Sequence, residues 1–137
     1  MAFDPIKDYP LGTKRPDLVT TAAGVSVDDI TLEAAREGRV VAPELSATPE
    51  TLRLQAQVAN ATGRTQLAES LERAAELATV PDDLLLEVYT ALRPGRATAR
   101  ELELWALRLE EFEAVKTAAF VREASAAYTE RGLLTHD

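Results

Sequence analysis

The chain has few side chains whose type and spacing could support chemistry. Two acidic pairs, Asp28-Asp29 and Asp82-Asp83, could ligate a metal ion or act as general acid and base. Both pairs precede apolar helical runs, where carboxylates are stabilised by unpaired backbone N–H groups and by the helix dipole. We therefore interpret both pairs as helix N-terminal residues. An acid–base enzyme that uses Asp82 or Asp83 is the alternative that this placement disfavours.

Histidine and cysteine chemistry is largely excluded by composition. The 137 residues contain no Cys and a single His, His136, next to the C-terminus. Thiolate nucleophiles and Cys-based zinc sites need cysteine, and a histidine at a fraying chain end is a poor base or ligand. The six glycines are isolated, so no phosphate-binding loop is present. The residues thus predict no catalytic, cofactor-binding or metal-ligating residue on this chain.

The charge pattern restricts the class of partner. There are 15 Lys and Arg against 23 Asp and Glu, a net charge of −8. Nucleic-acid binding requires clustered basic residues, so no nucleic-acid partner is expected. Arg93 and Arg96 flank a rigid Pro94-Gly95 turn. In one interpretation Arg93 stabilises the negative end of a helix dipole and Arg96 is simply solvated. In the other, both anchor carboxylates on a partner, and the sequence leaves both interpretations open.

The sequence shows neither a signal peptide nor a membrane-spanning segment. Residues 1–20 lack the apolar run of a signal peptide, and nowhere do 18 apolar residues follow one another. We therefore expect no membrane partner. The lack of cysteine is compatible with a cytoplasmic protein.

The elements that position these residues are predicted to be helices. The chain is 46% hydrophobic and rich in Ala, Leu, Glu and Arg, which are strong helix formers. Residues 1–27 contain three prolines and show no apolar period, which predicts an extended N-terminal arm. Residues 28–137 predict a helical domain. The expected fold is all-α: a short-helix bundle with an extended N-terminal arm and one long C-terminal helix.

Capping residues and glycines punctuate the predicted helices. We expect helices over residues 32–37, 49–62, 64–78 and 81–92, with Gly38 and Gly63 ending the first two. Thr98 and Glu101 form a capping box, and neither Gly nor Pro follows until Gly132. This predicts one helix from Ala99 to about Arg131, roughly 50 Å long at about 1.5 Å per residue. Part of such a helix must project beyond a compact domain of this size or be covered by something else.

Short strings of residues between 8 and 131 match a known family in unbroken order. They are Asp8–Leu11, Asp28–Glu33, Thr48–Ala56, Glu72–Leu77, Val80–Asp83, Tyr89, Ala91–Pro94 and Ala118–Ala124. Together they closely resemble the small (gamma) subunit of adenosylcobalamin-dependent diol and glycerol dehydratases. The strings at 48–53 and 80–83 look more like the diol branch.

The resemblance implies a lyase that is a dimer of heterotrimers, a heterohexamer of large, medium and small subunits. It would dehydrate propane-1,2-diol to propionaldehyde, glycerol to 3-hydroxypropionaldehyde or ethane-1,2-diol to acetaldehyde through a radical mechanism. Adenosylcobalamin would lie between the large and medium subunits, and the substrate with its metal ion in the large one. The small subunit would carry no catalytic residue and would pack on the large subunit. We expect these contact residues: Tyr9, Pro10, Leu11, Arg53, Tyr89, Arg93 and Pro94.

Two departures from the family pattern affect this expectation. Many diol dehydratase small subunits carry a long N-terminal extension linked to packaging in a bacterial microcompartment, whereas seven residues precede Asp8 here. Packaging through this chain is therefore doubtful, and a cytoplasmic location is expected. Gly95 stands where the family usually has an aromatic residue, which removes a contact from the turn. The alternatives to a diol dehydratase subunit are a glycerol dehydratase small subunit and a stand-alone helical adaptor or regulator that reuses the fold.

Overall fold

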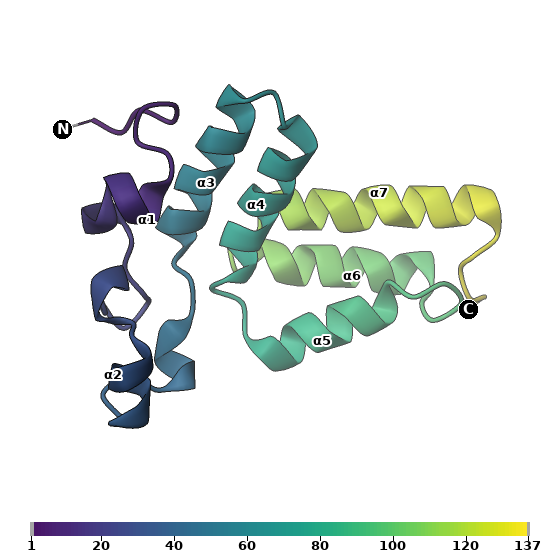
Figure 1. The fold of residues 1–137 in the computed structure, drawn as a ribbon. Coiled ribbons are helices and arrows are strands. Elements are labelled where there is room, and N and C mark those ends of the chain that lie inside the picture. The colour runs from purple at the N-terminus through teal and green to yellow at the C-terminus, as the bar shows by residue number, and fades with distance from the viewer. Residues whose placement is uncertain (1, 137) are drawn as a thin grey trace. The chain divides into compact units, whose positions relative to one another are not determined.

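The structure, a computed structural model, describes residues 2–136, and the elements in this range are helical apart from two isolated β-bridges (Figure 1). The all-α prediction is confirmed. The chain divides into two compact units, residues up to Ala78 and residues from Thr79 onward. The elements are α1 (Leu11–Lys14), η1 (Pro16–Leu18), η2 (Val27–Asp29), α2 (Leu32–Arg36), η3 (Ala42–Leu45), α3 (Pro49–Ala61), α4 (Thr65–Leu77), α5 (Asp82–Ala91), α6 (Ala99–Glu110) and α7 (Val115–Arg131).

The first unit is built on a hairpin of α3 and α4. The Thr48 hydroxyl accepts the backbone N–H of Thr51 at 3.2 Å, and Pro49 occupies the first helical position, as predicted. Gly63 has φ +76° and ends α3, a conformation that glycine adopts without a steric penalty. The two helices pack through small side chains with one leucine against them, namely Ala56, Ala59, Ala68 and Leu71.

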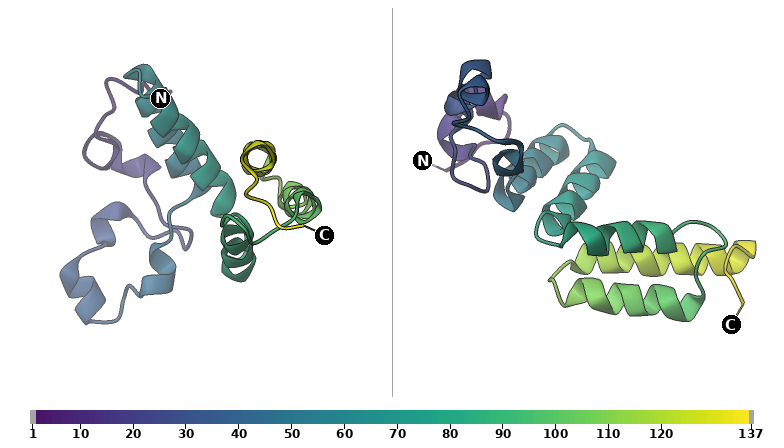
Figure 2. Two further views of the ribbon diagram at one scale, coloured as in Figure 1. Left: turned by 90° about the vertical axis from the view of Figure 1, so that its right-hand side faces the viewer. Right: turned by 90° about the horizontal axis from the view of Figure 1, so that it is seen from below.

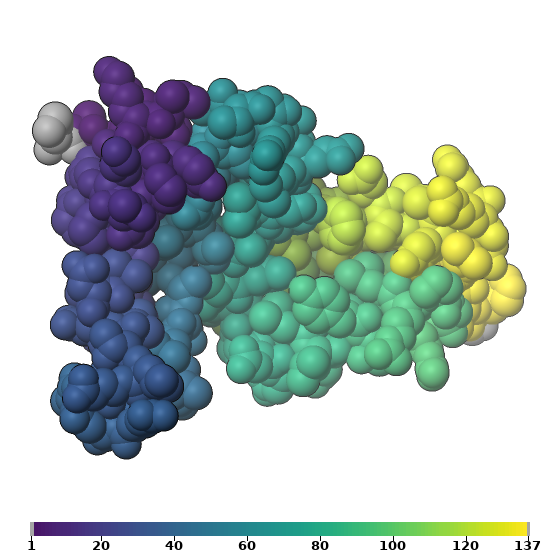
Figure 3. Space-filling view, viewed as in Figure 1, coloured from purple at the N-terminus to yellow at the C-terminus, as the bar shows by residue number. Residues whose placement is uncertain are grey.

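The N-terminal segment is more folded than the extended arm that its prolines predict. It contains α1, η1 and a tight turn in which the Asp4 carboxylate accepts the backbone N–H groups of Ile6 and Lys7. Such local side-chain bonds leave no periodic signal in the sequence. The predicted boundary after residue 27 falls inside the first unit. In the space-filling view the N-terminal residues lie against the α3–α4 hairpin (Figure 3).

The second unit contains α5, α6 and α7. The capping box that begins α6 is confirmed. The Thr98 hydroxyl accepts the backbone N–H of Glu101 at 3.2 Å, and the Glu101 carboxylate accepts that of Thr98 at 2.8 Å. Gly132 has φ +65° and ends α7, close to the predicted end at Arg131.

The predicted single helix from Ala99 to Arg131 is wrong, because the chain reverses between α6 and α7. The two helices lie side by side (Figures 1 and 2). Glu113 takes a left-handed φ of 60°, and the N–H of Ala114 bonds the carbonyl of Leu109 at 3.0 Å, which closes the end of α6. Glycine usually occupies such a position, so a glutamate there gives no warning of a helix end.

Folding back answers the question of excess helix length. On α6 Leu102, Ala106 and Leu109 are buried, and on α7 Ala118 and Val121 are buried. The apolar residues that a single long helix would have carried are therefore divided between two helices that pack together. Val115 lies at the start of α7 with 59% of its surface exposed.

Candidate functional site

Both acidic pairs lie in helical turns. Asp82-Asp83 begins the helix that its position predicts, whereas Asp28-Asp29 lies in a short helix that precedes α2. Asp82 and Asp83 are in the first turn of α5, and Asp28 and Asp29 are in η2. Thr31 caps α2, since its hydroxyl accepts the N–H of Ala34 at 3.1 Å. Within residues 2–136 no three His, Cys, Asp or Glu side chains form a group that could hold a metal ion. No helix in this range is long and apolar enough to cross a membrane.

Both units expose large apolar side chains. A monomeric protein scatters such residues singly, whereas several on neighbouring turns mark an interaction surface. On α6, Leu104 and Leu107 are one turn apart and both are exposed, although the other side of the same helix is buried. The exposed set comprises Ile6, Tyr9, Ile30, Leu32, Val41, Leu45, Leu67, Leu86, Tyr89, Leu104, Leu107, Val115 and Phe120.

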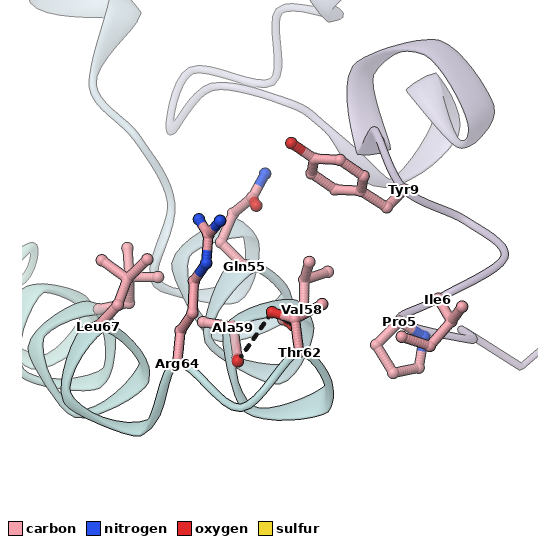
Figure 4. A pocket seen from close by; sticks show the side chains of 10 residues that line it. Pro5, Ile6, Tyr9, Gln55, Val58, Ala59, Thr62, Arg64 and Leu67 are labelled. Carbon is pink, nitrogen blue, oxygen red and sulfur yellow. Dashed lines mark hydrogen bonds between the residues drawn. The ribbon is translucent and has the colours of Figure 1, made fainter.

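A groove in the first unit gathers three of these side chains (Figure 4). The N-terminal segment contributes Ile6 and Tyr9, and α4 contributes Leu67. The groove encloses about 290 Å³, and its remaining walls are Pro5, Gln55, Val58, Ala59, Thr62, Arg64 and Leu71. We call this hollow the Tyr9 groove. It is mainly apolar, with a few polar groups at its edge.

The N-terminal wall of the Tyr9 groove is held by an acidic and basic network. The Asp8 carboxylate accepts the backbone N–H of Asp4 at 2.9 Å and pairs with the Arg15 guanidinium at 3.2 Å. Arg15 also pairs with Asp17 at 2.9 Å, and this hydrogen bond raises the pKa of Arg15 and lowers that of Asp17. Hydrogen bonds from the N–H groups of Lys7 and then Ile6 lower the pKa of Asp4. The carboxylates of Asp4 and Asp17 therefore stay ionised at neutral pH, and their hydrogen bonds help to keep the segment in place.

The helical wall of the Tyr9 groove is positioned by the α3–α4 turn. The Thr62 hydroxyl donates to the carbonyl of Val58 at 3.0 Å, and the N–H of Arg64 bonds the carbonyl of Ala59 at 2.8 Å. Arg64 precedes α4 directly, so its backbone is fixed at the groove edge. Figure 4 shows Arg64 and Gln55 extending in the same direction, with the Tyr9 ring across from them.

The second unit has an exposed surface along α5. Leu86 and Tyr89 lie one helical turn apart, with 68% and 58% of their surfaces exposed, and the exposed Arg93 follows one turn later. The turn after α5 is anchored on both sides. The N–H of Gly95 bonds the carbonyl of Leu133 at 2.8 Å, and the Tyr128 hydroxyl bonds that of Leu92 at 2.6 Å. Arg93 and Pro94 are thus presented on a well-held turn.

Comparison with known proteins identifies the family. The profile of the family described as "Dehydratase small subunit" matches residues 5–135. The chain belongs to this family. It is 51% identical over 133 residues to the propanediol dehydratase small subunit of Citrobacter freundii, an alignment that covers 96% of this chain and 77% of that protein. It is 50% identical, with the same coverage, to the propanediol dehydratase small subunit of Salmonella typhimurium strain LT2.

The structure of this dehydratase small subunit places most of the expected contact residues at the surface. Tyr9, Pro10 and Arg53 are exposed in the first unit. Tyr89, Arg93 and Pro94 are exposed and close together in the second. Leu11 is the exception: only 1% of it is exposed, so it is a core residue of α1 and offers no contact surface in this conformation.

Other residues of the Tyr9 groove were missed by sequence reasoning. Leu67 is 46% exposed, whereas Ala68 beside it is buried. Arg64 carried no signal except its position after the helix-ending Gly63. Ile6 lies in the N-terminal segment, where the apolar residues show no period. The groove joins residues more than 50 positions apart, which periodicity within one helix does not detect.

Proposed function

We propose that this chain is the small, non-catalytic subunit of an adenosylcobalamin-dependent diol dehydratase that converts propane-1,2-diol to propionaldehyde and water. The observation that carries the proposal is the family match along residues 5–135, together with two propanediol dehydratase small subunits about 50% identical over 96% of the chain. The complete enzyme would be a cytoplasmic dimer of heterotrimers, and this chain would pack on its large subunit.

The residues of this chain do not fit a cobalamin or catalytic site. The single imidazole, that of His136, is exposed near the C-terminus, and the acidic pairs occupy helix N-terminal turns. The radical chemistry would come from the cofactor, bound by the large and medium subunits. The part of this chain is to brace the large subunit, for which it needs a surface and not a nucleophile.

The proposed contact surface fits a permanent complex. Obligate interfaces are larger and more apolar than transient ones, and aromatic and arginine side chains are enriched in them. Tyr9 with Pro10, Arg53 on α3, and Tyr89 with Arg93 and Pro94 are exposed residues of these types. We propose these six as contacts with the large subunit.

Co-expression tests the proposal. The chain should co-purify with the large and medium dehydratase subunits, and its removal should lower their stability and their propanediol dehydratase activity. Full activity and stability of the other two subunits alone would refute the bracing role. Relative turnover of propane-1,2-diol, glycerol and ethane-1,2-diol by the complete enzyme distinguishes a diol from a glycerol dehydratase.

Sedimentation and thermal melting of the isolated chain address a stand-alone adaptor. An adaptor should be a monodisperse monomer that melts cooperatively. An obligate subunit should associate or melt broadly when its apolar contact surface is exposed to water. A soluble, sharply melting monomer that does not bind the other subunits would favour the adaptor.

A further inference from the structure

The Tyr9 groove is an apolar hollow that the described part of the chain leaves open. Ile6 and Tyr9 are 59% and 56% exposed although both line it, and Leu67 on the opposite wall is also about half-exposed. The free energy falls when another apolar side chain covers exposed apolar surface of this kind and removes it from water. The groove therefore has the properties of a receptor for a side chain from outside the chain.

The edge of the groove carries the positive charge of Arg64. In residues 2–136 no carboxylate forms an ion pair with Arg64, and no acidic residue is among the groove walls. Gln55 also lines the groove, and in Figure 4 its side chain extends toward the same side as that of Arg64. A guanidinium next to apolar walls binds a carboxylate through two parallel hydrogen bonds, and an amide can add a further donor.

The backbone under Arg64 is already ordered. The Arg64 N–H bonds the carbonyl of Ala59, the Arg64 carbonyl accepts the N–H of Ala68, and the neighbouring Gly63 bonds Asn60. Ordering such a segment during association would cost conformational entropy, and here the cost is met in the folded chain. The backbone of Arg64 is thus held in place at the groove edge, and binding of a partner would have to order only its side chain.

We infer that the Tyr9 groove receives a segment of the large subunit in which an apolar side chain neighbours an Asp or Glu carboxylate. The apolar side chain lies between Ile6, Tyr9 and Leu67, and the carboxylate binds Arg64. This inference rests on the proposed function and deepens it. It adds Arg64 to the contact residues and states the chemistry of the partner segment. Tyr9 belongs both to the groove and to the proposed contacts, which makes the groove continuous with that surface.

Binding of Arg64 variants to the large–medium complex tests the charge. Arg64→Gln should weaken binding about tenfold or more, since a hydrogen bond to a charged group is worth about 1.5–3 kcal/mol. Arg64→Glu should weaken it further, and Arg64→Lys should retain part of it. Added salt should weaken the wild-type complex more than the Arg64→Gln complex. Unchanged melting of the variant chains excludes a folding defect.

Arg100→Glu is the matched control. Arg100 is an exposed arginine in the first turn of α6, outside the groove, and a glutamate there suits the helix dipole. Arg100→Glu makes the same change of charge as Arg64→Glu and should bind as tightly as the wild type. If Arg64→Gln binds as tightly as the wild type, the inference is refuted and the proposed function stands. If the wild-type chain does not bind the complex, both are refuted.

The occupant itself is identified by photocrosslinking. A benzoylphenylalanine placed at Leu67 in the assembled complex should crosslink to a large-subunit peptide that contains an apolar residue next to Asp or Glu. A crosslink to a second copy of this chain, to the medium subunit or to a peptide without a carboxylate would overturn the inference. So would the absence of any crosslink in a complex that has assembled with normal affinity.

Discussion

Arg122 joins α7 to α6 through two carboxylates. Its guanidinium pairs with Glu103 at 2.9 Å and with Glu110 at 2.5 Å. The hydrogen bond from Arg122 lowers the pKa of Glu110, and Glu110 and then Glu103 raise the pKa of Arg122. All three side chains are a third or more exposed, so water and salt weaken these pairs. Arg122 therefore orients the two helices, while burial of apolar side chains provides most of the stability of the hairpin.

The Arg122 cluster predicts a pH-dependent stability difference. The pKa of Glu110 is lower in the folded chain than in the unfolded chain, so its contribution is present above the unfolded pKa. That contribution is lost as the pH falls through the folded pKa. Arg122→Gln should lower the melting temperature slightly at pH 7, and the difference from wild type should shrink below about pH 4. Thermal melts of both proteins over this range check it, and an equal difference at every pH would contradict it.

At the scale of the element, the chain reversal at Glu113 determines how α6 and α7 are arranged in the second unit. Helices α6 and α7 would form one continuous rod if residues 111–114 were helical. Instead Glu113 has φ 60°, and Leu109 and Glu110 accept the N–H groups of Ala114 and Glu113 at 3.0 and 2.9 Å. A side chain other than glycine costs roughly 1–2 kcal/mol in this conformation. The packing of α6 against α7 must offset that cost.

Glu113→Gly is therefore expected to stabilise the chain. Glycine takes a positive φ without strain, and part of the gain is offset by the greater entropy of the unfolded chain, which leaves about 0.5–1 kcal/mol. Chemical denaturation of the full chain measures the change in the free energy of unfolding. Glu111→Gly is the control: Glu111 has φ −61°, so the same substitution should destabilise by about 0.5–1 kcal/mol. Equal effects of the two substitutions would contradict the strain argument.

At the scale of the whole molecule, the chain has more apolar surface than it covers. Both units contribute exposed large side chains, and the burial within the chain depends strongly on alanine and valine. Small side chains allow close helix packing but remove less apolar area from water than leucine or phenylalanine does. Such a chain gains stability from a partner that covers its exposed side chains, as the proposed role in a dehydratase complex requires.

Tyr89 provides the test of this view on α5. Tyr89→Ala should weaken binding to the large–medium complex about 30-fold or more, as expected for an aromatic anchor worth about 2 kcal/mol. The melting temperature of the isolated chain should hardly change, because the side chain is exposed. Tyr89→Phe keeps the ring and should bind nearly as the wild type does. Normal binding of Tyr89→Ala would remove Tyr89 from the proposed contacts.

Local signals in the sequence were sufficient for several helix ends and for the family. Thr48, Thr98 and Gly63 act within one or two turns of their own position, so their roles follow from residue type and spacing. The matched strings likewise indicated the family without coordinates, and the family match over residues 5–135 confirms that family.

Only the tertiary structure decided the features that depend on distant residues. The reversal at Glu113 exists because α6 and α7 bury each other's apolar sides, and a glutamate in a left-handed conformation has no local preference that announces it. Leu11 is part of the core although its neighbour Tyr9 is exposed. The Tyr9 groove joins the N-terminal segment to α3 and α4. Capping is a local property of the chain, whereas burial and grooves belong to the packing of segments far apart in sequence.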